Sequence, residues 1–241
     1  MESENLFKNR RDKALKDLWQ DAKYGELISR TLADYEHLLR ANSGGQFPQD
    51  EFNARLKSGK VLDVGCGWGG FVDDCRKNGV DAYGVDIALA DKTNRSFADK
   101  GAVGSVVAAD AVGLPFKDGE FHTIINTAGA FSYAHSAEDL KSYIHEQLRL
   151  LHRGGKIIIN PIEIKDDKFF PMNFVDQFKN EAEASISGGA INELNDSFFE
   201  EIKNLENSGT ITAEIYDNDE PTDHRSLGRQ VQFGVLVIEK R

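Results

Sequence analysis

Polar side chains end four short apolar runs in the first two thirds of the chain, in a pattern that suits a nucleotide-like ligand. They are Asp63, Asp86, Asp110 and Asn126. In an open parallel sheet, ligands bind beyond the carboxyl ends of the strands. A carboxylate at the second strand end, roughly 20 residues past a glycine turn, suits a ribose because it accepts from both hydroxyls. Asp86 fits that role. Helix capping is the alternative for any one of these residues, but it does not explain all four.

A glycine-rich segment, Gly65-Cys66-Gly67-Trp68-Gly69-Gly70, follows the first apolar run. Glycine permits positive φ angles and lets a ligand lie against bare backbone. The spacing G-x-G-x-x-G is typical of dinucleotide sites, although alone it is a weak signal. Asp63 precedes the first glycine by two residues, where a carboxylate repels pyrophosphate and favours a cationic ligand. We expect Cys66 to be a buried thiol packed against the ligand crevice, and not a nucleophile.

The elements that position these residues follow from hydrophobic periodicity. Helical spacing over residues 6–41 stops before Gly44-Gly45, and residues 50–56 suit one more helical turn, which together predict an N-terminal helical appendage. Strands are predicted at 61–64, 82–85, 103–108, 122–126 and 156–160, with helices at 70–78, 90–100 and 138–152 between them. A helical insert over about 161–195, a helix at 195–207 and a hairpin of strands 210–216 and 230–239 complete the pattern.

This alternation predicts an α/β fold: a Rossmann-like, seven-stranded, mostly parallel sheet with helices on both faces and a C-terminal antiparallel hairpin. We divide the chain into a helical appendage or lid, residues 1–57, and a main domain, residues 58–241, which contains the insert.

The motifs together resemble the class I S-adenosylmethionine-dependent methyltransferase family. They are D-x-G-x-G-x-G from Asp63, the acid at the second strand end, D-A-x-x-L-P-F-x-D-G-x-F over residues 110–121, and the terminal hairpin. The resemblance is close over about residues 58–160. One departure is His122, which stands where the family usually has an aspartate. We interpret it as a structural substitute at the start of a strand.

The resemblance implies S-adenosylmethionine as the cofactor and assigns its contacts. Asp63, Gly65 and Gly67 would line the methionine moiety, whose amino group also reaches the backbone near Asn126. Asp86 would take the ribose hydroxyls. The remaining contacts would be to the adenine, from Ile87, Asp110 and Ala111.

The acceptor side of the site is less determined by the sequence. Methyl transfer depends mainly on alignment of the reacting atoms, and a general base is needed only where the acceptor must lose a proton. His135 is the candidate base, with a role at the entry of the next helix as the alternative. Tyr133 is a candidate for orienting the acceptor. Tyr24 of the appendage is a candidate for closing over the cofactor, with an ordinary core role as the alternative.

Composition restricts the partners. The chain has 241 residues, 40% of them hydrophobic, and a net charge of −11, which disfavours nucleic acid. No stretch approaches the roughly 20 apolar residues of a membrane span. The two cysteines and the polar N-terminus indicate a cytoplasmic protein. The six histidines lack paired metal-ligand spacing, so we expect no metal site.

The leading hypothesis is therefore a methyltransferase that acts on an oxygen or nitrogen of a small-molecule acceptor, by in-line displacement. A nicotinamide-dependent oxidoreductase is one alternative, supported by the glycine spacing alone. A non-catalytic partner protein that binds S-adenosylmethionine is another, because no base is unambiguous. Protein methylation also stays open, because an acidic surface attracts basic tails.

Overall fold

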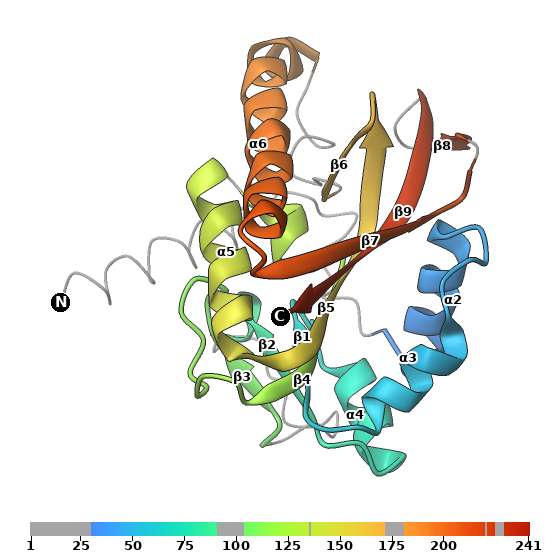
Figure 1. The fold of residues 1–241 in the computed structure, drawn as a ribbon, viewed down its shortest axis with the longest axis vertical. Helices are drawn as coiled ribbons and strands as arrows, with labels where there is room; N and C mark the ends of the chain where they lie inside the picture. Colours follow the sequence, from blue (N-terminus) through green and yellow to red (C-terminus); the bar gives the residue numbers. More distant parts are fainter. Residues whose placement is uncertain (1–29, 91–103, 135, 172–180, 220, 225–228) are drawn as a thin grey trace, which may run out of the picture.

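A twisted sheet forms the centre of the computed structural model, which describes residues 30–90, 104–134, 136–171, 181–219, 221–224 and 229–241 (Figure 1). Its main path runs β3-β2-β1-β4-β5-β9-β7. The strands are β1 (Val61–Val64), β2 (Ala82–Asp86), β3 (Val106–Ala108), β4 (Phe121–Thr127), β5 (Leu151–Lys165), β6 (Lys168–Pro171), β7 (Ile211–Asp217), β8 (Thr222–His224) and β9 (Arg229–Lys240).

The first five strands pair in parallel, whereas β9 is antiparallel to both β5 and β7. The chain moves outward from β1 to β3 and then returns to place β4 on the other side of β1. The strand order therefore reverses at β1, which is where open α/β sheets bind ligands. The predicted α/β fold with a C-terminal antiparallel hairpin is confirmed. The short strands β6 and β8 add to the seven of the main path.

Helices cover both faces of the sheet (Figure 1). One face carries α2 (Leu32–Asn42), α3 (Gln49–Leu56) and α4 (Gly70–Lys77), and the other carries α5 (Ala137–Leu150) and α6 (Glu181–Asn207). Two short 3-10 helices, η1 (Ile87–Ala90) and η3 (Ala130–Tyr133), follow β2 and β4. Among the described residues, no helix is both long and apolar enough to cross a bilayer.

Side chains of β1 alternate between the two cores, as the pleat of a strand requires. Val61 packs in the core under α2, α3 and α4, while Leu62 and Val64 pack in the core under α5 and α6. This alternation puts Asp63 on the α2 side of the sheet.

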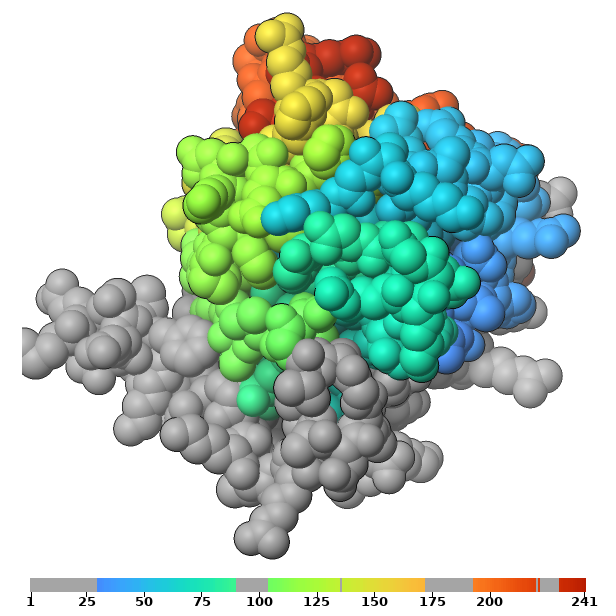
Figure 2. Space-filling view, turned by 90° about the horizontal axis from the view of Figure 1, so that it is seen from below, coloured from blue at the N-terminus to red at the C-terminus, as the bar shows by residue number. Residues whose placement is uncertain are grey.

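The helices α2 and α3 share a core with the sheet. Tyr35 and Leu39 of α2 and Phe52 of α3 are buried together with residues of β1, α4 and β9. Figure 2 shows the blue-to-cyan residues of these two helices beside the teal residues of α4. Thr31 caps α2 by accepting from the Asp34 backbone N–H. The division at residue 57 and the role of a lid stay predictions, since residues 1–29 lie outside the described part.

The segment after β5 differs from the prediction. Residues 162–171 form an antiparallel hairpin of β5 and β6, where the sequence predicted a helical insert. Asp166 and Asp167 make its turn with φ angles of 52° and 59°. Two consecutive left-handed residues match the twist of a two-residue hairpin. The helix predicted at 195–207 begins already at Glu181. The helix predicted at 90–100 lies almost wholly outside the described residues.

Candidate functional site

The glycine turn after β1 is packed tightly between two neighbouring strands. Gly65 has a φ of 86°, and a Cβ there would lie 2.5 Å from the Cα of Gly129, in the loop after β4. The backbone N–H groups of Gly65 and Cys66 both donate to the carbonyl of Val85, at 2.8 and 3.1 Å. Because these contacts leave no room for a side chain, only glycine at position 65 lets the turn pack directly against the backbone of Val85 and of Gly129.

Asp86 lies at the end of β2, directly beside this turn. Its Oδ2 accepts from the Gly67 N–H at 2.9 Å and its Oδ1 accepts from the Ala88 N–H at 2.9 Å. Burial raises the pKa of this carboxyl group, while the two backbone bonds lower it. Each carboxylate oxygen has a second lone pair, so two acceptor positions remain for ligand hydroxyls. The adjoining Ile87, the first residue of η1, is half-buried.

Asp63 is fully buried under α2, with an exposed fraction of 0%. Its Oδ2 accepts from the Tyr35 hydroxyl at 2.8 Å, whereas its Oδ1 has no hydrogen-bond partner. The pKa of Asp63 is raised to about 7, mainly by burial; the Tyr35 hydrogen bond lowers it and the nearby Asp86 charge raises it, within that net value. A buried oxygen without a donor is costly, and a ligand ammonium would supply the missing donor.

Asp110 follows β3 by two residues and is also buried, as is the adjacent Ala111. The loop that contains them is held to α5 by Arg149. Its Nη1 donates to the carbonyl of Phe116 at 3.0 Å, and its Nη2 donates to that of Leu114 at 3.2 Å. The motif over residues 110–121 is thus fixed against the sheet by a charged side chain from a helix.

Asn126 lies near the end of β4 with its side chain on the α5 face. Its Nδ2 donates to Oε1 of Gln147 at 2.7 Å, and its Oδ1 has no partner. Because the side chain points toward α5, the predicted contact with the methionine amino group would be made by the backbone near Asn126. That contact stays a prediction. Tyr133 ends η3, just beyond β4, and 37% of it is exposed.

The buried state of Cys66 is as expected. Its Sγ lies 3.6 Å from the Gly67 carbonyl, and burial raises its pKa well above the usual value, which keeps it a neutral thiol. A Cβ on Gly84 would lie 2.7 Å from this sulfur, so the side chain packs onto β2. Any contact of Cys66 with the cofactor would therefore be made by its backbone, and this contact stays a prediction. Tyr24 and His135 lie outside the described residues, and their roles stay predictions too.

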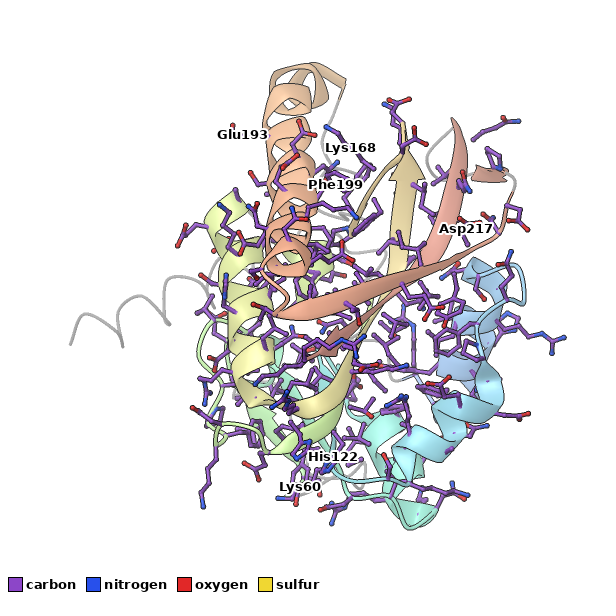
Figure 3. The ribbon with its side chains drawn as sticks, viewed as in Figure 1. Lys60, His122, Lys168, Glu193, Phe199 and Asp217 are labelled. Carbon is purple, nitrogen blue, oxygen red and sulfur yellow. The ribbon has the colours of Figure 1, made fainter. Side chains whose placement is uncertain are left out.

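His122 stands at the opposite end of the sheet. It lies in β4 near the first residue of that strand, beside Lys60, and its ring stacks on His152 with centroids 4.9 Å apart. Figure 3 shows His122 and Lys60 at one end of the molecule, far from Lys168 and Glu193. Its position agrees with a structural role.

Sequence reasoning missed three residues that build the site: Tyr35, Gln147 and Arg149. Gln147 carries a detectable signal, because it is a polar residue among the buried apolar residues of the amphipathic α5. Tyr35 falls within an apolar helical stripe, and nothing local to it points to Asp63, which lies 28 residues away.

The arrangement favours a ligand with positive charge and a sugar. Asp63 and Asp86 lie at the ends of β1 and β2, and Asp110 follows the adjacent β3. Burial raises the pKa of the first two. Carboxylates at this density attract cations and oppose a pyrophosphate. Within the described residues, there is no group of three or more histidine, cysteine or acidic side chains able to hold a metal ion.

Comparison with known proteins gives consistent matches. Residues 61–155 match the family model described as a methyltransferase domain. The chain is 38% identical over 109 residues to an uncharacterized protein of Methanocaldococcus jannaschii, an alignment that covers 45% of this chain and 47% of the relative. It is 28% identical over 167 residues to the 2-methyl-6-phytyl-1,4-hydroquinone methyltransferase of Synechocystis, covering 64% of this chain and 47% of the relative.

The chain thus spans about half the length of the curated relatives it matches. Among solved structures, a SAM-dependent methyltransferase from Methanosarcina mazei superimposes with a TM-score of 0.50 and 16% identity. That alignment covers 80% of this chain and 97% of the other. At this identity the likeness concerns the fold.

Proposed function

We propose that this chain, which belongs to the class I S-adenosylmethionine-dependent methyltransferase family, transfers a methyl group from S-adenosylmethionine to an oxygen or nitrogen of a small-molecule acceptor. The single observation that supports this most is the set of carboxylates at the ends of β1 and β2 and just after β3, beside the glycine turn. A cofactor with an ammonium, a sulfonium and a ribose diol matches those groups, whereas a nicotinamide dinucleotide brings two phosphates to the same carboxylates.

Each residue has a separate role in this proposal. Asp63 accepts from the cofactor ammonium through its free Oδ1. Asp86 accepts from the ribose hydroxyls through the lone pairs that Gly67 and Ala88 leave open. Asp110 and Ala111 contact the adenine from the loop that Arg149 fixes.

When bound, the cofactor supplies a methyl carbon on a positively charged sulfur, which is a good leaving group. The residues around it then need to align an acceptor with that carbon and exclude water. In this proposal Tyr133 orients the acceptor, which is supported by its partial exposure at the end of η3. His135 is the base for acceptors that must lose a proton.

Calorimetry with S-adenosylhomocysteine tests the cofactor site. We expect Asp86→Ala to weaken binding about tenfold to a hundredfold, because two hydrogen bonds to a charged acceptor are lost. Asp81→Ala is the matched control: it removes an exposed aspartate just before β2, at the other end of that strand. Equal affinity of the Asp86 variant and the wild type would refute the site. Saturable NADH binding at the turn would favour the oxidoreductase instead.

Methyl transfer is tested with S-adenosylmethionine that carries a radioactive methyl group. The acceptors are a panel of phenols, hydroxy acids and amines, with basic peptides as a separate arm. Label in a small molecule supports the proposal. Label only in peptides would replace it with protein methylation, and cofactor binding without transfer to any acceptor would favour a non-catalytic partner protein.

A further inference from the structure

Tyr35 joins the helix α2 to both sides of the glycine turn. Its hydroxyl donates to Asp63, two residues before the turn, at 2.8 Å. Its ring stacks on Phe71, the second residue of α4 after the turn, with centroids 4.3 Å apart and planes at 20°. Both Tyr35 and Asp63 are buried, at 2% and 0% exposed. One side chain of α2 therefore contacts the residues on either side of the turn.

The helix that carries Tyr35 is itself held at both ends. At its start, the Leu32 N–H donates to Oδ2 of Asp74 in α4, at 3.2 Å. At its end, the Nδ2 of Asn42 donates to Oδ1 of Asn160 in β5, at 2.7 Å. These two contacts fix the start of α2 to α4 and its end to β5. The position of the Tyr35 phenol therefore depends on the position of the whole helix.

We propose that Tyr35 is a positioning residue for the cofactor: it fixes the Asp63 carboxylate so that Oδ1 receives the cofactor ammonium, and it thereby couples cofactor affinity to the seating of α2. The bond to Oδ2 restricts rotation of the carboxylate and leaves the second oxygen as the acceptor. This inference rests on the proposed function, because it assumes that Asp63 meets an ammonium.

The charge on Asp63 gives the inference a distinctive signature. Its pKa is raised to about 7 as the net effect of burial, which raises it most, of Tyr35 and Arg30, which lower it, and of Asp86, which raises it. The thiol of Cys66 faces the same carboxylate, and its own raised pKa keeps it neutral. Cys75 of α4 is likewise neutral, with a pKa raised to about 12. Loss of the phenol therefore raises the pKa of Asp63 and shifts the ionised, binding-competent form to higher pH.

The test is calorimetric titration of the full chain with S-adenosylhomocysteine between pH 6 and pH 9. For Tyr35→Phe we expect affinity at pH 7 to fall about tenfold, with the rise of affinity shifted about one pH unit upward. The loss shrinks toward pH 9, where Asp63 ionises in both proteins. The ammonium of the ligand also titrates, but it affects the wild type and Tyr35→Phe equally and cancels when their affinities are compared. Tyr83→Phe is the control, because Tyr83 packs against Phe116 and Phe121 on the other face of the sheet.

A merely structural role of Tyr35 would lower affinity equally at every pH, and that result overturns the inference. So does an unchanged profile in Tyr35→Phe. Asp63→Asn provides the second check. Its affinity for S-adenosylhomocysteine should be low, and the pH dependence that ionisation of residue 63 causes should be absent. Adding Tyr35→Phe to this variant should cause no further loss of affinity. Independent, additive losses contradict the coupling. Absence of binding by the wild type at any pH would instead refute the proposed function itself.

Discussion

Asp63→Asn should make the ligand-free protein more stable at alkaline pH while it weakens the cofactor site. The folded-state pKa of Asp63 is raised from 3.8 to about 7 by burial. Between these values the folded protein keeps a proton that the unfolded chain releases. The stability that Asp63 contributes is therefore present at low pH and is lost as pH rises toward 7.

The magnitude follows from the size of the shift. A rise from 3.8 to about 7 corresponds to about 4 kcal/mol, of which about 3 kcal/mol falls between pH 5 and pH 8. Asparagine has no charge to bury, although its Nδ2 lacks a partner there and costs about 1–3 kcal/mol at every pH. The free energy of unfolding of Asp63→Asn, relative to the wild type, should thus increase by about 3 kcal/mol from pH 5 to pH 8.

Urea unfolding of both proteins at the two pH values measures this difference, with Asp81→Asn as the exposed control. A relative stability of Asp63→Asn that is the same at pH 5 and pH 8 would refute the reasoning. Added S-adenosylhomocysteine at a hundredfold excess over its dissociation constant should stabilise the wild type by about 2.7 kcal/mol. We expect much less stabilisation of the variant at the same concentration.

Substitutions at three further positions, with Gly45→Ala as a control, test the supports of the site by thermal and urea unfolding. Gly65→Ala and Gly45→Ala both place alanine at a φ of 86°, which costs about 1–2 kcal/mol of stability. Only at Gly65 would the Cβ meet backbone atoms within 4 Å. Gly65→Ala should therefore lose more stability than Gly45→Ala, and it should also lose cofactor affinity. Arg149→Met should cost about 1–2 kcal/mol by releasing the loop over residues 110–121. Asn42→Ala should cost about 1–2 kcal/mol because it leaves Oδ1 of Asn160 buried without a donor.

Each of these has a clear contrary result. Equal losses in the two glycine variants would mean that the turn has room to move away from Gly129. An unchanged free energy of unfolding in Arg149→Met would mean that the loop holds its position without Arg149. A neutral Asn42→Ala would mean that the end of α2 is held by apolar packing alone.

The sheet and the carboxylates could be predicted from the sequence because their signals are local. The run 61–64, the glycines behind it and the spacing to Asp86 fall within about one strand-helix-strand unit. The hairpin of β5 and β6 was missed for a reason that is also local: its turn consists of Asp166 and Asp167, which have no glycine to mark two positive φ angles.

The Tyr35–Asp63 contact could not be predicted from local patterns. It depends on which face α2 turns toward the sheet and on how far along β1 the helix crosses, and both are set by tertiary packing. The apolar stripe that contains Tyr35 and Leu39 identifies the buried face of the helix, but it does not distinguish a packing tyrosine from one that donates to a carboxylate.

The place of β9 between β5 and β7 constrains how the sheet is completed during synthesis. The strand pairs with β5 along residues 156–164 and with β7 along residues 211–217, yet it follows both in the chain. Until residues 229–240 leave the ribosome, two strand edges lack a neighbour, and one of them carries the isoleucines 157–159. A nascent or truncated chain that stops before Arg229 therefore presents an open, apolar edge to other molecules.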